Sequence, residues 1–289
     1  MKLTFKIFIY LIFFTILLSC SKKKIKENTI HGQRIISLAP SITETLFLLD
    51  VEKNIIGVSE YSNFPEEARL IQIVSSISDL NLEFILKLKP DIAFILPSQT
   101  KFQEQLLEMG IKCHVTDQRS VDKIITSIQL IGKELKLDFK AKYISDSLTT
   151  ILNNVRATEK QNKNILISIG RDFSSEISSI YSTGKETFLD NIITLLGYNN
   201  ALDSDVPYPK ISAETIIRLD PDIIIDLLPL TDPDDINQAE NSWKSLSSLS
   251  AVRNKKIYLF TSDYTTIPGP RIFKFIQELS DTLKNKNPE

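Results

Sequence analysis

One twelve-residue pattern occurs twice in this chain, from Asn81 to Ile92 and again from Ser212 to Ile223. Each copy has a residue that can cap a helix, a glutamate two places later, a stretch ending in leucine, and then Pro-Asp-Ile before a hydrophobic run. A capping side chain before apolar residues predicts a short helix, and the apolar run after it predicts a buried strand. The repeat therefore predicts two similar lobes, each displaying one acid, Glu83 or Glu214, at the equivalent place on its surface.

Hydrophobic runs alternate with amphipathic segments through the rest of the chain. Hydrophobic residues make up 42% of the sequence, which is enough to fill the core of a soluble protein. The alternation predicts an α/β fold in which each lobe has a parallel sheet flanked by helices. We expect an N-terminal lobe over 34–120, a helical connector over 121–160 and a C-terminal lobe over 161–289. Within the connector, one long helix from Asp138 to about Lys160 is expected to join the lobes.

Two local patterns give further expectations about secondary structure. Ser41 and Glu44 are spaced as a capping box, with Ser41 at the start of a helix and Glu44 reaching back to it. The acidic and polar stretch from Thr231 to Asn241 is expected to be a surface loop.

The N-terminus has the features of an export signal. Two lysines precede an apolar segment, from Ile7 to Leu18, that is too short to span a bilayer comfortably. It ends in Leu-Leu-Ser-Cys, which resembles the lipobox of bacterial lipoproteins. We therefore expect residues 1–19 to be removed, Cys20 to carry a lipid, and residues 20–33 to tether the protein to the periplasmic side of a bacterial membrane.

Several function classes are excluded or disfavoured. No two of the eight glycines lie within four positions of each other, so neither glycine-rich nucleotide-binding motif is present. The formal net charge of −2 implies no basic face for nucleic acid. His31 and His114 are the only histidines, too few for an imidazole-rich metal site. We expect no metal site, no cofactor and a structural role for His114. Cys113 is expected to be a small buried hydrophobe.

Four segments of the chain carry a family resemblance: Arg34–Glu44, Asn81–Asp91, Ser182–Glu186 and Pro268–Arg271. They resemble the helical-backbone substrate-binding proteins of ABC importers, a family that takes up cobalamin, ferric siderophores, haem and some metals. The resemblance extends to about Leu283 and is greatest to the cobalamin-binding branch, in the segments Tyr61–Pro65, Val206–Pro209 and Thr261–Tyr264. It implies two lobes joined by a helical backbone, a large ligand in the cleft between them, and no enzymatic activity.

The resemblance also implies sites for the ligand and for the transporter. The ligand would lie beyond the carboxyl ends of the strands. The expected ligand-binding residues are Tyr61, Phe173, Tyr208, Asp263, Tyr264 and Arg271. Glu83 and Glu214 would each meet an arginine on one subunit of a permease dimer, which works with ATPase subunits. The binding protein itself is expected to be a monomer.

The identity of the ligand is left open between related compounds. A corrinoid is the first expectation, because the cleft segments are mainly aromatic and neutral and tyrosines can stack on a flat macrocycle. That branch tends to use tryptophans, whereas the one tryptophan here, Trp243, lies outside the matching segments. A ferric siderophore or haem is the alternative. An exported hydrolase that uses only carboxylates is the rival from another class, although no nucleophile and base are spaced for catalysis.

Overall fold

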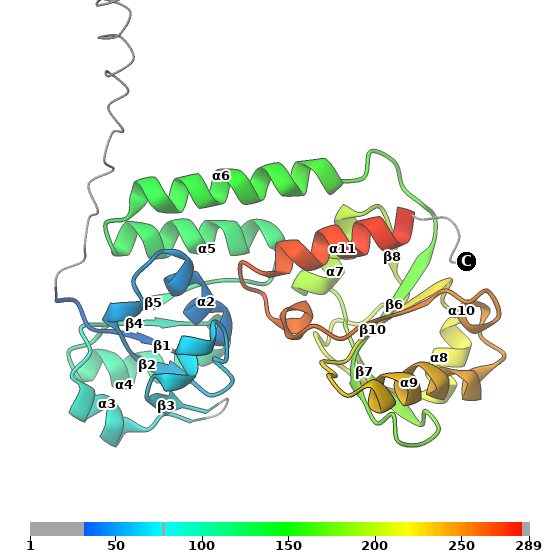
Figure 1. The fold of residues 1–289 in the computed structure, drawn as a ribbon, viewed down its shortest axis with the longest axis horizontal. Helices are drawn as coiled ribbons and strands as arrows, with labels where there is room; N and C mark the ends of the chain where they lie inside the picture. Colours follow the sequence, from blue (N-terminus) through cyan, green and yellow to red (C-terminus); the bar gives the residue numbers. More distant parts are fainter. Residues whose placement is uncertain (1–31, 77–78, 285–289) are drawn as a thin grey trace, which may run out of the picture.

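The structure, a computed structural model, describes residues 32–76 and 79–284 and shows two α/β lobes beneath a layer of helices (Figure 1). The expected signal peptide, the lipidation site Cys20 and most of the tether lie outside the described residues. Within the described ranges, no helix has both the length and the apolar character needed to cross a membrane.

The N-terminal lobe has a five-stranded sheet in the order β3-β2-β1-β4-β5, and every pairing is parallel. Helices cross between the strands, as parallel pairing requires. The strands are β1 (Ile35–Ser37), β2 (Ile55–Ser59), β3 (Ile73–Ser75), β4 (Ile92–Ile95) and β5 (Lys112–Val115). The helices are α2 (Pro40–Leu48), α3 (Leu82–Leu88) and α4 (Gln103–Glu108), with short 3₁₀ turns at Glu52–Asn54, Glu66–Leu70 and Pro97–Phe102.

The C-terminal lobe has a mixed sheet in the order β11-β10-β6-β7-β9, with β8 also pairing β6. Its strands are β6 (Asn164–Arg171), β7 (Ser179–Ser182), β8 (Asn199–Asn200), β9 (Lys210–Ser212), β10 (Ile223–Leu227) and β11 (Ile257–Phe260). The prediction of a wholly parallel sheet is wrong here, because β7 runs antiparallel to both β6 and β9. A short loop without a crossover helix joins β6 to β7, and such a connection permits only antiparallel pairing.

The helices of this lobe are α7 (Phe188–Leu195), α8 (Ala213–Leu219), α9 (Pro233–Ser242), α10 (Ser250–Arg253) and α11 (Ile272–Lys284), with 3₁₀ turns at Trp243–Leu246 and Asp263–Thr266. The prediction of a loop over Thr231–Asn241 is wrong, because α9 occupies most of it. The carboxylate of Asp232 accepts a hydrogen bond from the amide of Asp234 at 2.8 Å, and Pro233 occupies the first turn. Both features stabilise a helix start in a polar sequence.

The repeated sequence pattern forms the same local structure in both lobes. Asn81 caps α3 and Ser212 caps α8, each by accepting a hydrogen bond from a backbone amide of the first turn. After each helix the Pro-Asp pair turns the chain into β4 or β10. The carboxylate of Asp91 then accepts from the amide of Arg34 at 2.7 Å, and that of Asp222 accepts from the amide of Asn164 at 2.8 Å. Each motif therefore ties itself to the start of the first strand of its own lobe, to Arg34 just before β1 and to Asn164 at the start of β6.

The lobes are joined by an antiparallel pair of helices, α5 (Val121–Glu134) and α6 (Asp138–Val155), with α11 packed against α6 (Figure 1). Lys140, near the start of α6, forms an ion pair with Asp50 of the N-terminal lobe. Just beyond its end, the amide of Ala157 donates to the carbonyl oxygen of Leu195 in the C-terminal lobe at 2.9 Å. The helix thus crosses from one lobe to the other, but it ends before the expected Lys160 because Arg156 leaves helical geometry.

The expected capping box at the start of α2 is also absent. The helix begins at Pro40, after Ala39, and no side chain caps it. The hydroxyl of Ser41 instead donates to Gln118, and the carboxylate of Glu44 accepts from Arg271. Both side chains have been drawn into tertiary contacts, so the local spacing that suggested a cap did not determine their partners.

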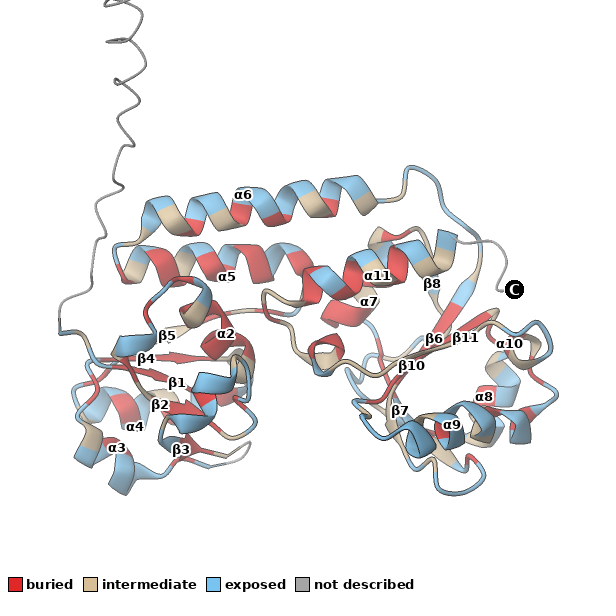
Figure 2. Cartoon of the chain, in the orientation of Figure 1, coloured by how far each residue is buried: buried red, intermediate tan, exposed pale blue. Residues whose placement is uncertain are grey.

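Each connecting helix has a buried face, and that of α6 lies against α5 and α11 (Figure 2). On α5 the buried residues recur at helical spacing along one face, including Val121, Ile124, Ile128 and Ile131. These side chains belong to one hydrophobic cluster that also includes Ile35 of β1 and Ile165 of β6. The apolar core is therefore continuous from one lobe to the other.

A second feature of the C-terminal lobe is a buried ion pair. Arg171 donates from Nε and Nη2 to the Oδ2 atom of Asp226, at 3.0 and 2.7 Å. The indole nitrogen of Trp243 donates to the same oxygen at 2.8 Å. The side chains of Arg171 and Asp226 are 0% and 1% exposed. This cluster ties β6 and β10 to the segment that follows α9, so Trp243 has a structural role.

Replacing Arg171 with Met is expected to lower the free energy of unfolding by about 3–5 kcal/mol, because Asp226 would be left as an uncompensated buried charge. Urea unfolding followed by circular dichroism would measure the change. The matched control is Lys87→Met, which removes an exposed ion pair with Glu83 and should change stability by less than about 1 kcal/mol. Equal losses in the two variants would contradict the structural role of the Arg171 cluster.

Candidate functional site

Three of the residues expected to bind ligand lie just beyond the carboxyl ends of strands. Tyr61 follows β2, Phe173 follows β6 and Asp263 follows β11. In α/β sheets this edge is where ligands commonly bind. The first residue belongs to the N-terminal lobe and the other two to the C-terminal lobe.

Buried hydroxyl groups hold the loop that carries Tyr61. The hydroxyl of Thr43 on α2 lies 2.8 Å from that of Ser37 and 3.1 Å from that of Ser62, which lies 2.9 Å from that of Ser59. Tyr61, next to Ser62, has a φ of 64° and is 59% exposed. A left-handed backbone is costly for tyrosine, so its retention reflects the hydrogen bonds around it. The result is a ring presented outward from a fixed loop.

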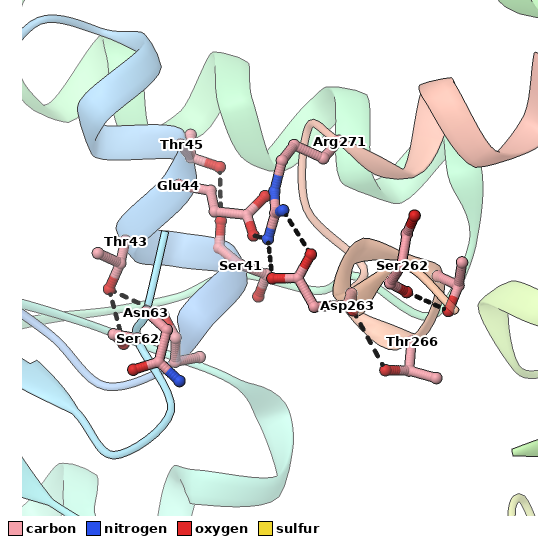
Figure 3. A network of polar contacts seen from close by, with 12 residues as sticks. Ser41, Thr43, Glu44, Thr45, Ser62, Asn63, Ser262, Asp263, Thr266 and Arg271 are labelled. Atoms are coloured by element: carbon pink, nitrogen blue, oxygen red, sulfur yellow. Dashed lines mark hydrogen bonds and ion pairs between the residues drawn. The ribbon is translucent and has the colours of Figure 1, made fainter. Parts of the chain in front are cut away.

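Arg271 lies at the junction of the two lobes (Figure 3). Its Nη2 atom donates to Oε1 of Glu44, on α2 of the N-terminal lobe, at 2.6 Å. Its Nη1 and Nη2 atoms also donate to the two carboxylate oxygens of Asp263, at 2.8 and 3.0 Å. The guanidinium carbon lies 3.8 Å from the ring centroid of Phe64, a cation–π distance. One cation therefore contacts both lobes.

Burial and charge act in opposite directions on the two carboxylates. Burial raises the pKa of Glu44, whose side chain is 3% exposed, and the hydrogen bond from Arg271 only partly offsets that rise. For Asp263 the hydrogen bonds from Arg271 dominate and lower its pKa. Asp263 is therefore ionised at neutral pH, and its side chain remains 54% exposed at the junction.

Tyr264 does not present its ring in the same way as Tyr61. It is 7% exposed, and its hydroxyl group donates to the carboxylate of Glu278 on α11 at 2.8 Å. Its ring also lies beneath the charged groups of Arg271 and Lys274. In this arrangement Tyr264 packs within the C-terminal lobe and attaches α11 to the loop after β11.

Tyr208 is held at the surface by two of the resemblance segments together. The amide of Ser182 donates to the carbonyl oxygen of Pro209 at 2.9 Å, and that of Gly184 donates to Pro207 at 2.8 Å. A side chain at Gly184 would collide with the carbonyl oxygen of Val206. Glycine is therefore needed for the Tyr208 loop to lie this close. Tyr208 is 44% exposed, and desolvation raises its pKa to about 12.

The structure brings some of the expected residues together and leaves others apart. Asp263 and Arg271 are in contact, and Phe64 links them to the loop of Tyr61. Among the interactions of the described residues, no hydrogen bond, ion pair or ring contact joins Phe173 or Tyr208 to this group. Phe173 is half-buried.

Two members of the junction, Phe64 and Glu44, were not among the expected site residues. Phe64 lies in the segment Tyr61–Pro65 that carried the family resemblance, so that segment was a usable signal. Glu44 had been explained by its local spacing to Ser41. No local pattern indicates that its partner is Arg271, far along the chain.

The two acids of the repeat are exposed on short helices. Glu83 on α3 pairs with Lys87 at 2.6 Å, and its side chain is 77% exposed. Glu214 on α8 is also exposed. Both helices lie on the sides of their lobes away from α6 (Figure 1). A partner reaching both acids would approach from the side opposite the connecting helices.

Neither a metal site nor a reactive thiol is apparent in the part of the chain that the structure describes. No group of three His, Cys, Asp or Glu residues there is arranged to hold a metal ion. His114 lies 3.3 Å from the carboxylate of Glu134 and stacks near Phe94. Cys113 is half-buried, and desolvation raises its pKa to about 11, which leaves little thiolate at neutral pH.

Comparison with known proteins identifies the family. The sequence profile of the periplasmic binding proteins matches residues 35–264, most of the chain. The chain belongs to this family. This periplasmic binding protein is 27% identical over 263 residues, 87% of its length and 80% of the relative's, to the uncharacterised ABC transporter substrate-binding lipoprotein YvrC of Bacillus subtilis. It is 26% identical over 268 residues, 88% and 90% of the two chains, to a vitamin B12-binding protein of Vibrio cholerae.

Solved structures agree on the fold. The vitamin B12-binding protein BtuF of Vibrio cholerae matches with a TM-score of 0.71 and 23% identity, covering 87% of this chain and 96% of that one. The haem-binding protein HutB of the same organism matches with a TM-score of 0.71 and 20% identity, covering 87% and 99%. The two-lobe fold is thus shared by carriers of different ligands.

These matches establish the class of activity. This periplasmic binding protein is an extracytoplasmic substrate-binding component of an ABC importer and belongs to a family of carriers rather than enzymes. Membership implies a small-molecule ligand, a permease and ATPase subunits as partners. The prediction of a bilobed importer component is confirmed. The comparisons leave vitamin B12, haem and iron compounds all open as the ligand.

Proposed function

We propose that this periplasmic binding protein carries a corrinoid in the cleft between its lobes and delivers it to an ABC permease. It would do so as a monomer, anchored through a lipid on Cys20 at the periplasmic side of a bacterial membrane. The relatives named vitamin B12-binding proteins cover nearly nine-tenths of this chain. The lipoprotein YvrC, similar over almost the same length, supports the anchor.

The charge at the lobe junction supports a neutral ligand. Arg271 already donates to Glu44 and Asp263, so its charge is neutralised within the protein. An anionic ferric chelate would need a cation that is available to it. The exposed ring of Tyr61, with Asp263 as a hydrogen-bond acceptor, instead suits a flat macrocycle with amides at its rim. The neutralised Arg271 is the observation that carries the choice of a corrinoid over a siderophore.

The tyrosines argue against haem as the ligand, but less strongly than Arg271 argues against a siderophore. A tyrosine that ligates ferric haem must lose its proton, and partial desolvation raises the pKa of Tyr208 to about 12, which makes that loss harder. The hydroxyl of Tyr264 is already bonded to Glu278. Tyr61 is the remaining tyrosine among the expected ligand residues, so hemin belongs in any test of the ligand.

Titration of the purified mature protein with cyanocobalamin, hemin and a set of ferric siderophores tests this function. Visible absorbance of the ligands and calorimetry are the readouts, because Trp243 is 1% exposed and bonded to Asp226, which makes it a poor reporter. Saturable one-to-one binding of cyanocobalamin is expected. Binding of hemin or a siderophore alone would make the ligand assignment wrong while leaving the importer role in place.

Replacing Tyr208 with Ala is expected to weaken cyanocobalamin binding about tenfold, since the loss of one aromatic stack corresponds to roughly 1–1.5 kcal/mol. Tyr208→Phe should retain most of the affinity, because the ring and not the hydroxyl group would make the contact. Tyr143→Ala is the matched control, since Tyr143 is 68% exposed on α6, away from the strand ends. Unchanged affinity in Tyr208→Ala would remove this residue from the proposed pocket.

We further propose that Glu83 and Glu214 dock the carrier on the permease. They occupy the same place in two copies of one local structure, and the copies lie in different lobes. A pair of acids arranged in this way matches a partner with two-fold symmetry. Arginines on the partner would form directional, charge-assisted pairs with them.

Replacing Glu83 and Glu214 together with Ala should abolish ligand uptake by cells while leaving the affinity of the purified protein within about twofold of wild type, because neither acid lies at the lobe junction. Uptake of labelled cyanocobalamin and calorimetry would measure the two effects. A control pair, Glu104→Ala with Glu240→Ala, removes one exposed acid from each lobe outside the repeat. Loss of affinity in the Glu83 and Glu214 variant, or equal loss of uptake in the control, would contradict a docking role.

A further inference from the structure

At the junction between the lobes, Arg271 makes several contacts within the protein that binding a ligand would not require. Arg271 precedes α11 in the C-terminal lobe, and it contacts two separate elements of the N-terminal lobe. One is α2, through Glu44 at 2.6 Å, and the other is the loop after β2, through the ring of Phe64 at 3.8 Å. The guanidinium group is thus held between both lobes by protein contacts alone.

Because Glu44 is buried, its carboxylate depends strongly on the contact with Arg271. Its side chain is 3% exposed, and its second oxygen, Oε2, is buried without a partner among the described residues. A carboxylate that has lost its water depends on the cation beside it. If the lobes moved apart at this point, Glu44 would be separated from Arg271, and only entry of water could compensate it. Separation of the lobes is therefore linked to hydration of this pair.

The backbone packs just as closely beside the ion pair. A Cβ atom at Gly269 would lie 2.9 Å from Oε2 of Glu44 and 3.2 Å from Cα of Ser41. The Pro268–Pro270 segment of the C-terminal lobe thus rests directly on α2. Any larger residue at Gly269 would have to displace either the Glu44 side chain or the helix itself.

The same contacts connect to the expected ligand-binding residues on both sides. On the N-terminal side, Phe64 belongs to the loop of Tyr61, and Thr43, next to Glu44, donates to Ser62 of that loop. On the C-terminal side, Arg271 holds both carboxylate oxygens of Asp263 (Figure 3). A change in the position of Arg271 would therefore move Asp263 and the loop of Tyr61, which lie on the two sides of the proposed cleft.

We infer that Glu44 and Arg271 form an interlobe clamp that sets the width of the cleft and orients Tyr61 and Asp263 across it. Both are positioning residues, and the role assigned to Arg271 shifts from touching the ligand to holding the lobes. Asp263 orients the guanidinium from within its own lobe, whereas Glu44 provides the bond between lobes. The inference rests on the ligand-binding cleft proposed above, but it does not depend on which ligand that cleft holds.

The test is the distribution of distances between the lobes without ligand, measured by energy transfer between two fluorophores. Glu67→Cys and Asp235→Cys supply exposed labelling sites, one on each lobe, in the full mature chain with Cys20→Ser and Cys113→Ser. Glu44→Gln is nearly isosteric but removes the charge, so a broader distribution shifted to longer distances is expected. Gly269→Ala keeps every charge but crowds Oε2 of Glu44 and the backbone of α2, so a smaller shift in the same direction is expected.

Two further variants separate a clamp from a general loss of structure. Asp263→Asn removes the carboxylate that Arg271 contacts within its own lobe. This variant should leave the interlobe distances close to those of the parent protein. Arg271→Lys keeps the positive charge but not the planar guanidinium that can donate to two carboxylates at once. It should therefore give a distance distribution of intermediate width. A distribution in Glu44→Gln that matches the parent would overturn the inference, as would equal broadening in Asp263→Asn. Circular dichroism confirms that each variant compared is folded.

Discussion

A single apolar core runs through both lobes of this protein, and the rest of the structure depends on that continuity. The cluster includes strands of both sheets and the buried faces of α5, α6 and α11. Burying this surface stabilises each lobe and at the same time attaches it to the same helices. Neither lobe can rotate far without exposing apolar surface, so the proposed cleft between them would be largely preformed. A preformed cleft reduces the ordering cost of binding.

The polar contacts at the junction act within this constraint. The helices determine roughly where the lobes sit, and the contacts among Glu44, Arg271 and Gly269 determine how closely their facing edges approach. The buried pair of Arg171 and Asp226 is a useful contrast, because it lies wholly within the C-terminal lobe. The two arginines are similarly neutralised, yet only Arg271 couples the lobes. The same chemistry therefore serves internal stability in one place and interlobe geometry in the other.

The repeat accounts for how the two acids proposed to dock on the permease are positioned. Its copies do more than place Glu83 and Glu214 on equivalent helices. Through Asp91 and Asp222 each copy also bonds to the first strand of its own lobe. The position of each acid is thus tied to the sheet beneath it. The separation between the acids is then set by the continuous core and by the contacts at the junction.

Local sequence pattern was sufficient to predict several features of this protein. The repeat predicted two lobes, strand and helix spacing predicted α/β layers, and the segments of family resemblance predicted a carrier of an ABC importer. Of the expected site residues, Asp263 and Arg271 are in contact at the lobe junction, and Phe64 brings the loop of Tyr61 to them; their role in binding stays a prediction. Tertiary structure alone decided the rest. Glu44 and Arg271 are paired although local spacing offered Glu44 a cap, and Tyr264 is buried because its hydroxyl group reaches Glu278. β7 runs antiparallel because a short loop precedes it. Local spacing fixes which residues share a helix or a strand, but the partner of a buried polar group depends on which distant segment the packed core brings beside it.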